Sequence, residues 1–424
     1  MKKLLVSVAV LVSLCALIFL SYTWVTGKGD PYAEELPQIP QEKSSTDGIL
    51  PEEQELGDRK SEEPEESRES AAAGETKVEN GVPRQVRHRT GYAYDTLPVD
   101  QKTLYDEILE GLENREQESD LSTVDETTLS KVFQCVINDH PEIFYVDGYT
   151  YTKYKTGNEI TQITFHGNYI YDGEEIAERQ EKIETLVDEI FEQMPVGMDD
   201  YGTVRYLYEY VIEHTQYQLD APDSQNICSV FLNGESVCQG YAKALQYLVQ
   251  EAGLEATLVL GYVENGDGHA WDLVKMDGDW YYVDPTWGDA SYQMEEGSGE
   301  YEESDTPTMN YDYLGVTTGQ LLVTHRIDNV VPMPVCDSMR DNYYVREGAY
   351  FTEIDTEQLQ RLFDRAVQQD KAVVTLKCSD HQLYEQMKEY LLTKQNVFSY
   401  LDAKDGVLAY YDSSAQYTIG VWIP

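Results

Sequence analysis

The chain has 424 residues, of which 78 are Asp or Glu and 31 are Lys or Arg, so its formal net charge at neutral pH is -47. A chain of this length can form two or three domains with a substantial core. The strong negative charge repels nucleic-acid phosphates, so we exclude nucleic acid as a partner.

Residues 1–27 predict a membrane segment. Lys2 and Lys3 precede a continuous apolar run from Leu4 to about Val25, long enough, at roughly 20 residues, to cross the bilayer core as a helix. The lysines before the run and the acidic chain after it favour an orientation with the bulk of the protein outside the cytoplasm. No small-residue cleavage site follows the run. We therefore expect a single-pass cell-membrane anchor, with a cleaved signal and secretion as the alternative.

Residues 28–90 predict a disordered acidic linker. The stretch "PEEQELGDRKSEEPEESRESAAAGE" is rich in Glu, Ser and Pro and has few large apolar side chains. Such a sequence cannot bury enough surface to offset the loss of chain entropy on folding.

Residues 91–195 predict an N-terminal α+β region. Apolar side chains recur at helical spacing from Asp125, a suitable helix cap, and Pro141 ends that pattern. Cys135 lies on the apolar stripe, so we expect a buried thiol. Alternating aromatic and polar residues predict strands at "FYVDGYTYTKYK" and "ITQITFHGNYIY". The other helices expected here and just beyond cover 99–116, 173–193 and 201–214.

Residues 196–335 form the central region, and the stretch "GESVCQGYAKALQYLVQEAGL" predicts an amphipathic helix with Cys238 in its first turn. Ala242, Leu245 and Leu248 continue the apolar stripe, and Gly253 is placed to end the helix. Free backbone N–H groups and the helix dipole favour a thiolate at this end. The same N–H groups are suited to bind the oxyanion formed at an attacked carbonyl.

The segments after this helix predict three strands, at 255–263, 269–276 and 280–285. Asp277 and Gly278 form a strong signal for a two-residue turn. With that turn Met276 faces Asp279, and His269 and Asp284 project from the same face of the sheet as diagonal neighbours, at about 7–8 Å between backbones. The histidine and the aspartate are therefore expected within side-chain reach of each other.

A Cys at a helix start, a His on one strand and an Asp on the next have a shared chemical logic. The imidazole takes the thiol proton, and the carboxylate orients the imidazole. The thiolate then attacks an amide carbonyl and expels an amine, which leaves a thioester for water or a second amine to resolve.

The blocks "SVCQGYAKALQYL" and "GHAWDLVKMDGDWYYVDPTW", in the order Cys, His, Asp, resemble the transglutaminase-like superfamily of papain-type cysteine enzymes, especially its extracytoplasmic bacterial members. The resemblance covers roughly residues 200–290. It implies an α+β fold in which the nucleophile helix packs on an antiparallel sheet. It also implies that Cys238 is the nucleophile, His269 the base and Asp284 the orienting acid, with no cofactor. The family commonly has Asn where this chain has Asp272, a position expected on the other sheet face.

Further candidates for the oxyanion site or the substrate groove surround this triad. The family's second oxyanion donor lies upstream of the cysteine, where Gln216 and Tyr217 are candidates, and Gln239 belongs to the first turn beside the oxyanion site. Trp271 and Trp287 flank the triad and are interpreted as groove walls, with core packing as an equal alternative.

Other roles for Cys238 stay open at this point: a core thiol, a disulfide with Cys228, or a metal ligand. No CxxC or HxxxH spacing supports a metal site, so we predict none. Residues 336–424 predict a small C-terminal α+β domain with helices at 355–369 and 381–394 and a strand at 371–378.

The function expected from these features is cysteine-dependent acyl transfer or hydrolysis of peptide or protein amides outside the cytoplasm, with cell-wall and surface proteins as candidate substrates. The alternative is a non-catalytic cell-surface binding or scaffolding protein that retains the fold.

Overall fold

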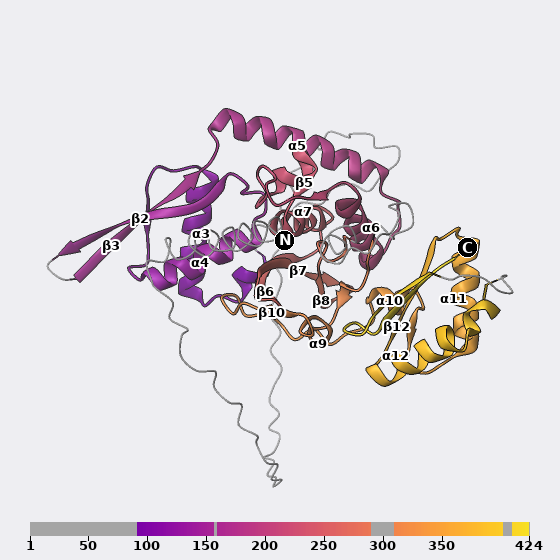
Figure 1. Ribbon diagram of the computed structural model, residues 1–424. Coiled ribbons are helices and arrows are strands. Elements are labelled where there is room, and N and C mark those ends of the chain that lie inside the picture. The colour runs from indigo at the N-terminus through magenta and orange to yellow at the C-terminus, as the bar shows by residue number, and fades with distance from the viewer. Residues whose placement is uncertain (1–90, 157–158, 290–308, 402–408, 424) are drawn as a thin grey trace, which may run out of the picture. The chain divides into compact units, whose positions relative to one another are not determined.

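The structure is a computed structural model that describes residues 91–156, 159–289, 309–401 and 409–423 (Figure 1). The predicted anchor at 1–27 and the predicted linker at 28–90 lie outside the described residues. Within the described part of the chain, no helix is both long and apolar enough to cross a membrane. Helices and mainly antiparallel sheets together make an α+β fold, as the sequence predicts.

The N-terminal region contains a three-stranded antiparallel sheet in the order β1-β3-β2. Asp125 caps α4 by accepting a hydrogen bond from the Thr128 N–H, as predicted, and Cys135 is buried on that helix. The elements are α2 (Tyr92–Asp95), α3 (Val99–Glu113), β1 (Ser119–Leu121), α4 (Glu126–Asp139), β2 (Val146–Thr156) and β3 (Glu159–Tyr169).

Two long helices follow this sheet: α5 (Gly173–Gln193) and α6 (Asp200–Glu213). Asp172 begins α5 with a capping box, and the Asp199 side chain accepts from the Gly202 N–H at the start of α6. These caps satisfy backbone donors that a helix start leaves open, which explains why the predicted bounds of both helices agree with the structure to within a residue.

The central sheet has five strands in the order β10-β6-β7-β8-β9, with antiparallel neighbours throughout. The predicted register of the β7–β8 hairpin is confirmed, since Met276 pairs with Asp279. Asp277 and Gly278 have φ values of 48° and 91°, as a type I′ turn requires. The strands are β6 (Ala256–Val263), β7 (Gly268–Met276), β8 (Asp279–Val283), β9 (Leu314–Val316) and β10 (His325–Ile327).

Helix α7 (Cys238–Glu251) packs against β6 and β7 (Figure 1). Ala242 of this helix lies in one apolar cluster with Leu258 and Ala270. Because side chains alternate along a strand, Trp271 projects from the opposite face, in a second cluster with Tyr313 and others. Before α7 come β4 (Gln216–Tyr217), the π-helical turn η1 (Ser229–Asn233) and β5 (Glu235–Ser236), with β4 and β5 paired in parallel.

The C-terminal region has a four-stranded sheet in the order β11-β12-β14-β13, and α11 and α12 pack against β12 (Figure 1). Asp312, just before β9, accepts hydrogen bonds from Tyr344 and Thr418 and so links this region to the central one. The elements are α9 (Thr318–Leu321), α10 (Tyr343–Arg346), β11 (Tyr350–Phe351), α11 (Thr356–Gln368), β12 (Val373–Cys378), α12 (His381–Lys388), η2 (Glu389–Thr393), η3 (Asn396–Ser399), β13 (Tyr410–Ser413) and β14 (Thr418–Trp422).

Candidate active site

Cys238 is the first residue of α7 and is half-buried. Its helix begins after Val237, and no side chain caps it. Five other helices begin with an aspartate whose carboxylate accepts from a backbone N–H: α4, α5, α6, α11 and α12. The start of α7 therefore keeps N–H groups that no side chain occupies, in the place where an oxyanion beside the thiol would need donors.

The first turn of α7 is held in place by close packing around Gly240. A Cβ atom built on Gly240 would lie 2.0 Å from Ser236 Oγ and 2.5 Å from Ser229 Oγ, and those two hydroxyls are 2.6 Å apart. Gln239 Nε2 donates to the Gln225 carbonyl at 3.2 Å. Gly240 therefore lets a neighbouring chain segment approach closely, and the position of Cys238 is fixed through the backbone.

His269 and Asp284 meet on one face of the sheet, as the hairpin register predicts. His269 Nε2 lies 2.8 Å from Asp284 Oδ2, and both side chains are buried. The other carboxylate oxygen, Oδ1, accepts from the backbone N–H groups of Thr286 and Trp287 at 2.9 and 3.1 Å. The turn after β8 thereby holds the carboxylate by its backbone.

The Cys238 thiol lies beside the imidazole of His269 and contributes to the raised pKa of that ring. Burial by itself lowers the pKa of His269, but the charge and hydrogen bond of Asp284, together with the contact to Cys238, outweigh it and raise that pKa to about 10. Asp284 is also buried, which opposes its charge, yet the two histidines around it hold the pKa of its carboxyl well below the usual range. Since Nε2 faces Asp284, Nδ1 is the ring nitrogen left for the thiol proton.

A second histidine, His325 of β10, binds the same carboxylate oxygen. Its Nε2 lies 3.1 Å from Asp284 Oδ2, and the side chain is completely buried. Sequence reasoning gave His325 no role because its neighbours along the chain carry no chemistry. The pairing of β10 with β6, in which His325 faces Val263, brings it to the site, and no local sequence pattern signals that pairing.

Aromatic rings surround the two histidines. Trp271 lies 4.9 Å from His325 between ring centroids, and Trp287 lies 4.7 Å from it. Trp271 is fully buried, so its interpretation as a groove wall is wrong and the alternative, core packing, holds. Trp287 is partly exposed and lies 6.1 Å from the His269 ring, which is compatible with a place at the edge of a groove.

The upstream candidates lie beside the start of α7. Tyr217 pairs with Ser236, two residues before Cys238, and its ring is 6.2 Å from that of Tyr241. Gln216 is exposed and pairs with Glu235. Their role as oxyanion donors stays a prediction.

The part of the chain that forms this site matches a known protein family. The family model described as the transglutaminase-like superfamily matches residues 189–285. This range contains α6, α7 and β6 to β8, and with them Cys238, His269 and Asp284. Residues 189–285 therefore form a transglutaminase-like domain. This superfamily generally includes cysteine-dependent enzymes.

The chain also aligns with curated proteins over a limited length. Kyphoscoliosis peptidase of Mus musculus is 26% identical over 105 residues, which cover 21% of this chain and 16% of the mouse protein. Kyphoscoliosis peptidase of Homo sapiens is 23% identical over 122 residues, which cover 25% of this chain and 18% of the human protein. The chain therefore spans less than a fifth of the length of these relatives.

Two solved structures are similar to the described chain. The crystal structure of a TGase is 19% identical, with a TM-score of 0.26, and the match covers 39% of this chain and 50% of that one. The periplasmic domain of TgpA from Pseudomonas aeruginosa is 18% identical, with a TM-score of 0.22, and the match covers 36% and 67%.

The state of the cysteines and the contacts of the two histidines also test the other roles considered for Cys238, a disulfide and a metal ligand. All five cysteines in the described part of the chain are free thiols, so the disulfide between Cys228 and Cys238 is wrong. His269, Asp284 and His325 offer ligand atoms within 4.8 Å of one another. In the structure those atoms are joined by hydrogen bonds at 2.8 and 3.1 Å, so a metal there would have to displace the protons between them.

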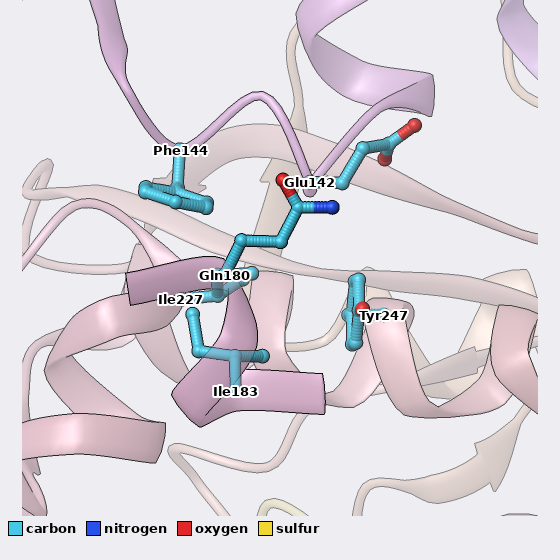
Figure 2. A pocket seen from close by; sticks show the side chains of 6 residues that line it. All are labelled: Glu142, Phe144, Gln180, Ile183, Ile227 and Tyr247. Carbon is cyan, nitrogen blue, oxygen red and sulfur yellow. The ribbon is translucent and has the colours of Figure 1, made fainter. Parts of the chain in front are cut away.

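Two hollows in the protein surface involve neither the nucleophile helix start nor the triad. A cavity of about 20 Å³, large enough for about one water molecule, lies between α5 and Tyr247 of α7 (Figure 2). A polar recess of about 310 Å³ lies on the N-terminal sheet and is lined by residues that include Thr150, Thr164 and His166. Neither hollow includes a triad residue of the transglutaminase-like domain.

Proposed function

We propose that the transglutaminase-like domain performs cysteine-dependent acyl transfer or hydrolysis on peptide or protein amides, through a thioester on Cys238. One observation carries the proposal: a thiol at an uncapped helix start lies beside an imidazole whose Nε2 a buried carboxylate holds at 2.8 Å. An imidazolium next to a thiol favours the thiolate, which is the reactive form.

In the first half-reaction the Cys238 sulfur attacks the carbonyl carbon of the amide. The carbonyl oxygen becomes an oxyanion, for which the backbone N–H groups of the first turn of α7 are the available donors. The C–N bond then breaks, and His269 gives its proton to the leaving amine. The products of this step are a free amine and a thioester on Cys238, with a neutral imidazole.

In the second half-reaction water or a second amine attacks the thioester carbonyl. His269 accepts a proton from the attacking group, the C–S bond breaks, and the sulfur leaves as a thiolate that again faces an imidazolium. With water the product is a carboxylic acid, and with an amine it is a new amide. Asp284 keeps the ring in one orientation through both halves.

The substrate class rests on the family and on the relatives. The transglutaminase-like fold suggests protein or peptide substrates in general, and two matched relatives carry the name peptidase. Cell-wall or surface proteins are the candidates if the N-terminal segment anchors the chain outside the cytoplasm, which is part of the proposal.

The experiment that tests this proposal measures the rate at which iodoacetamide alkylates the full chain at neutral pH. Cys135, Cys228, Cys336 and Cys378 are buried, and the variant Cys238→Ser measures labelling at every other thiol, including Cys15. After that background is subtracted, we expect His269→Ala to slow alkylation at least tenfold. Equal rates in the two proteins would refute an activated thiolate. If Cys238→Ala keeps the full cellular phenotype, the non-catalytic binding alternative is correct instead.

A further inference from the structure

A continuous line of buried hydrogen bonds runs from the C-terminal sheet to the candidate triad. It begins at Lys377 of β12, whose Nζ donates to Gln416 Oε1 at 3.0 Å. Gln416 Nε2 in turn donates to the Tyr313 hydroxyl at 2.8 Å. All three side chains are buried. Lys377 of the C-terminal sheet and Gln416 of the turn between β13 and β14 thus reach a tyrosine that lies just before β9.

The line continues from Tyr313 to the carboxylate. The Tyr313 hydroxyl lies 2.7 Å from Thr324 Oγ1, which lies 2.8 Å from His325 Nδ1. His325 Nε2 lies 3.1 Å from Asp284 Oδ2. Thr324 and His325 are also buried, so every member of the line depends on its neighbours for hydrogen bonds.

The direction of the line follows from its first member. Burial lowers the pKa of Lys377, and the charge of Asp312, whose Oδ1 lies 3.8 Å from Nζ, opposes that shift. In its charged form a lysine has three donors and no acceptor. Gln416 must therefore present its oxygen to Lys377 and its NH2 group to Tyr313. Since the Tyr313 oxygen accepts from Gln416, its own proton is available to Thr324. The Thr324 proton is then available to His325 Nδ1.

The last member of the line agrees with this direction. The ionised carboxylate of Asp284 only accepts hydrogen bonds, so His325 Nε2 must carry a proton. With a Thr324 proton directed at Nδ1, that nitrogen is unprotonated and the ring is neutral. A charged His325 would turn a second N–H toward Thr324 and would place two cations 5.5 Å apart between ring centroids, beside His269.

We propose that His325 is a positioning residue that holds Asp284 as a neutral Nε2–H donor, and that Lys377 and Gln416 of the C-terminal region set its tautomer. This inference rests on the proposed function of the triad. With His325 in place Asp284 accepts four hydrogen bonds, from His269 and His325 at Oδ2 and from Thr286 and Trp287 at Oδ1. A carboxylate held at both oxygens cannot rotate, and the His269 ring that it orients is fixed with it.

The first test reads the tautomer directly by 15N NMR of the full chain labelled at histidine, at pH 7. The His325 signals are those that vanish in His325→Gln. We expect the pattern of a neutral ring protonated at Nε2. In the near-isosteric variant Gln416→Glu, the new carboxylate accepts from both Lys377 and Tyr313. That change reverses the Tyr313 and Thr324 hydroxyls, so Nδ1 of His325 must become protonated.

The control for the added charge is Gln382→Glu, on the exposed face of α12, which should leave the His325 signals unchanged. A wild-type His325 protonated at Nδ1, or an unchanged pattern in Gln416→Glu, would overturn the inference. The NMR measurement of the His325 tautomer does not require an active enzyme. A neutral Nε2–H ring in a protein whose Cys238 is unreactive would therefore refute the proposed function and leave the tautomer assignment standing.

The second test separates positioning from packing by the iodoacetamide rate of Cys238. His325→Phe keeps a ring and removes the donor, and we expect a fall of about 10- to 100-fold, by analogy with the loss of a hydrogen-bond partner that orients a metal-ligating histidine. His325→Gln retains an Nε2 donor and should recover part of that loss. Equal losses in the two variants would mean that His325 contributes packing alone and would overturn the positioning role.

Discussion

His269 Nε2 and Asp284 Oδ2 lie 2.8 Å apart across a hairpin whose register is set by a two-residue turn. Replacing Asp284 by Asn leaves a side chain of the same shape but removes the charge that orients the ring and stabilises its protonated form. We expect the rate of amide turnover to fall by about 10³-fold or more, as in other enzymes where this carboxylate is lost. Asp279→Asn, on the same hairpin and partly exposed, is the matched control and should keep the wild-type rate. A rate for Asp284→Asn within a factor of three of that control would contradict the role of the carboxylate.

The raised pKa of His269 predicts a pH dependence of stability. The folded-state pKa of about 10 lies above the ordinary histidine value of 6.5. The stabilisation is therefore present in full below about pH 6.5 and is lost as the pH rises through about 10. Urea midpoints measured between pH 6 and pH 10.5 should fall more in the wild type than in His269→Gln. The tyrosines titrate in both proteins, so they cancel in the difference. Parallel curves would show that His269 is not charged in the folded state.

Replacing the buried Asp272 by Asn is expected to stabilise the folded protein. Its carboxyl is completely buried on the sheet face opposite Asp284, and neither oxygen has a hydrogen-bond partner among the described residues. Burial, and then the charge of Asp284, raise the pKa of Asp272 well above its usual value. The unfolded chain ionises near pH 4, so stability falls as the pH rises from there toward the folded-state pKa.

Asp272→Asn removes this dependence because an amide is neutral at every pH. We expect the free energy of unfolding at pH 7.5 to rise by about 1–3 kcal/mol, with the gain shrinking toward pH 4. Thermal unfolding at several pH values provides the measurement. A variant less stable than wild type at pH 7.5 would mean that the carboxylate has a partner worth more than its burial costs.

Replacing Gly240 by Ala is expected to displace the first turn of α7 and so to lower the reactivity of Cys238. In Gly240→Ala the new methyl group would lie 2.0 Å from Ser236 Oγ and 2.8 Å from the Ser224 carbonyl oxygen, so the first turn of α7 has to move. We expect a loss of about 1–3 kcal/mol of stability and slower alkylation of Cys238. The control is Gly319→Ala in α9, where the nearest atom is 3.9 Å from the new Cβ, and it should change neither quantity.

Chelation should leave the reactivity of Cys238 unchanged. His269 and His325 direct Nε2 protons at Asp284, so the three groups are satisfied without a cation. The alkylation rate of the full chain after dialysis against EDTA is therefore expected to equal the rate before it. A lower rate that zinc restores would show that these residues serve as metal ligands.

The parts of the site that sequence reasoning found are those set by local rules. A two-residue turn fixes the phase of two strands, so the common face of His269 and Asp284 follows from the positions of Asp277 and Gly278. The apolar stripe and the terminating Gly253 place Cys238 at a helix start.

The parts that it missed depend on contacts between distant segments. His325 reaches Asp284 only because β10 joins the far edge of the sheet beside β6. Strand order beyond adjacent hairpins is not encoded in any short stretch. Trp271 was interpreted as a groove wall for a similar reason: the cluster that buries it draws Tyr313, Leu321 and Cys336 from later in the chain.

The line of hydrogen bonds from Lys377 to Asp284 has a consequence for the order of synthesis. Cys238, His269 and Asp284 emerge from the ribosome before β12 and β14 exist. The nascent chain thus carries the proposed nucleophile while the proposed orienting acid still lacks part of its support. Under the proposed function, full reactivity of Cys238 is expected only after the C-terminal sheet has formed.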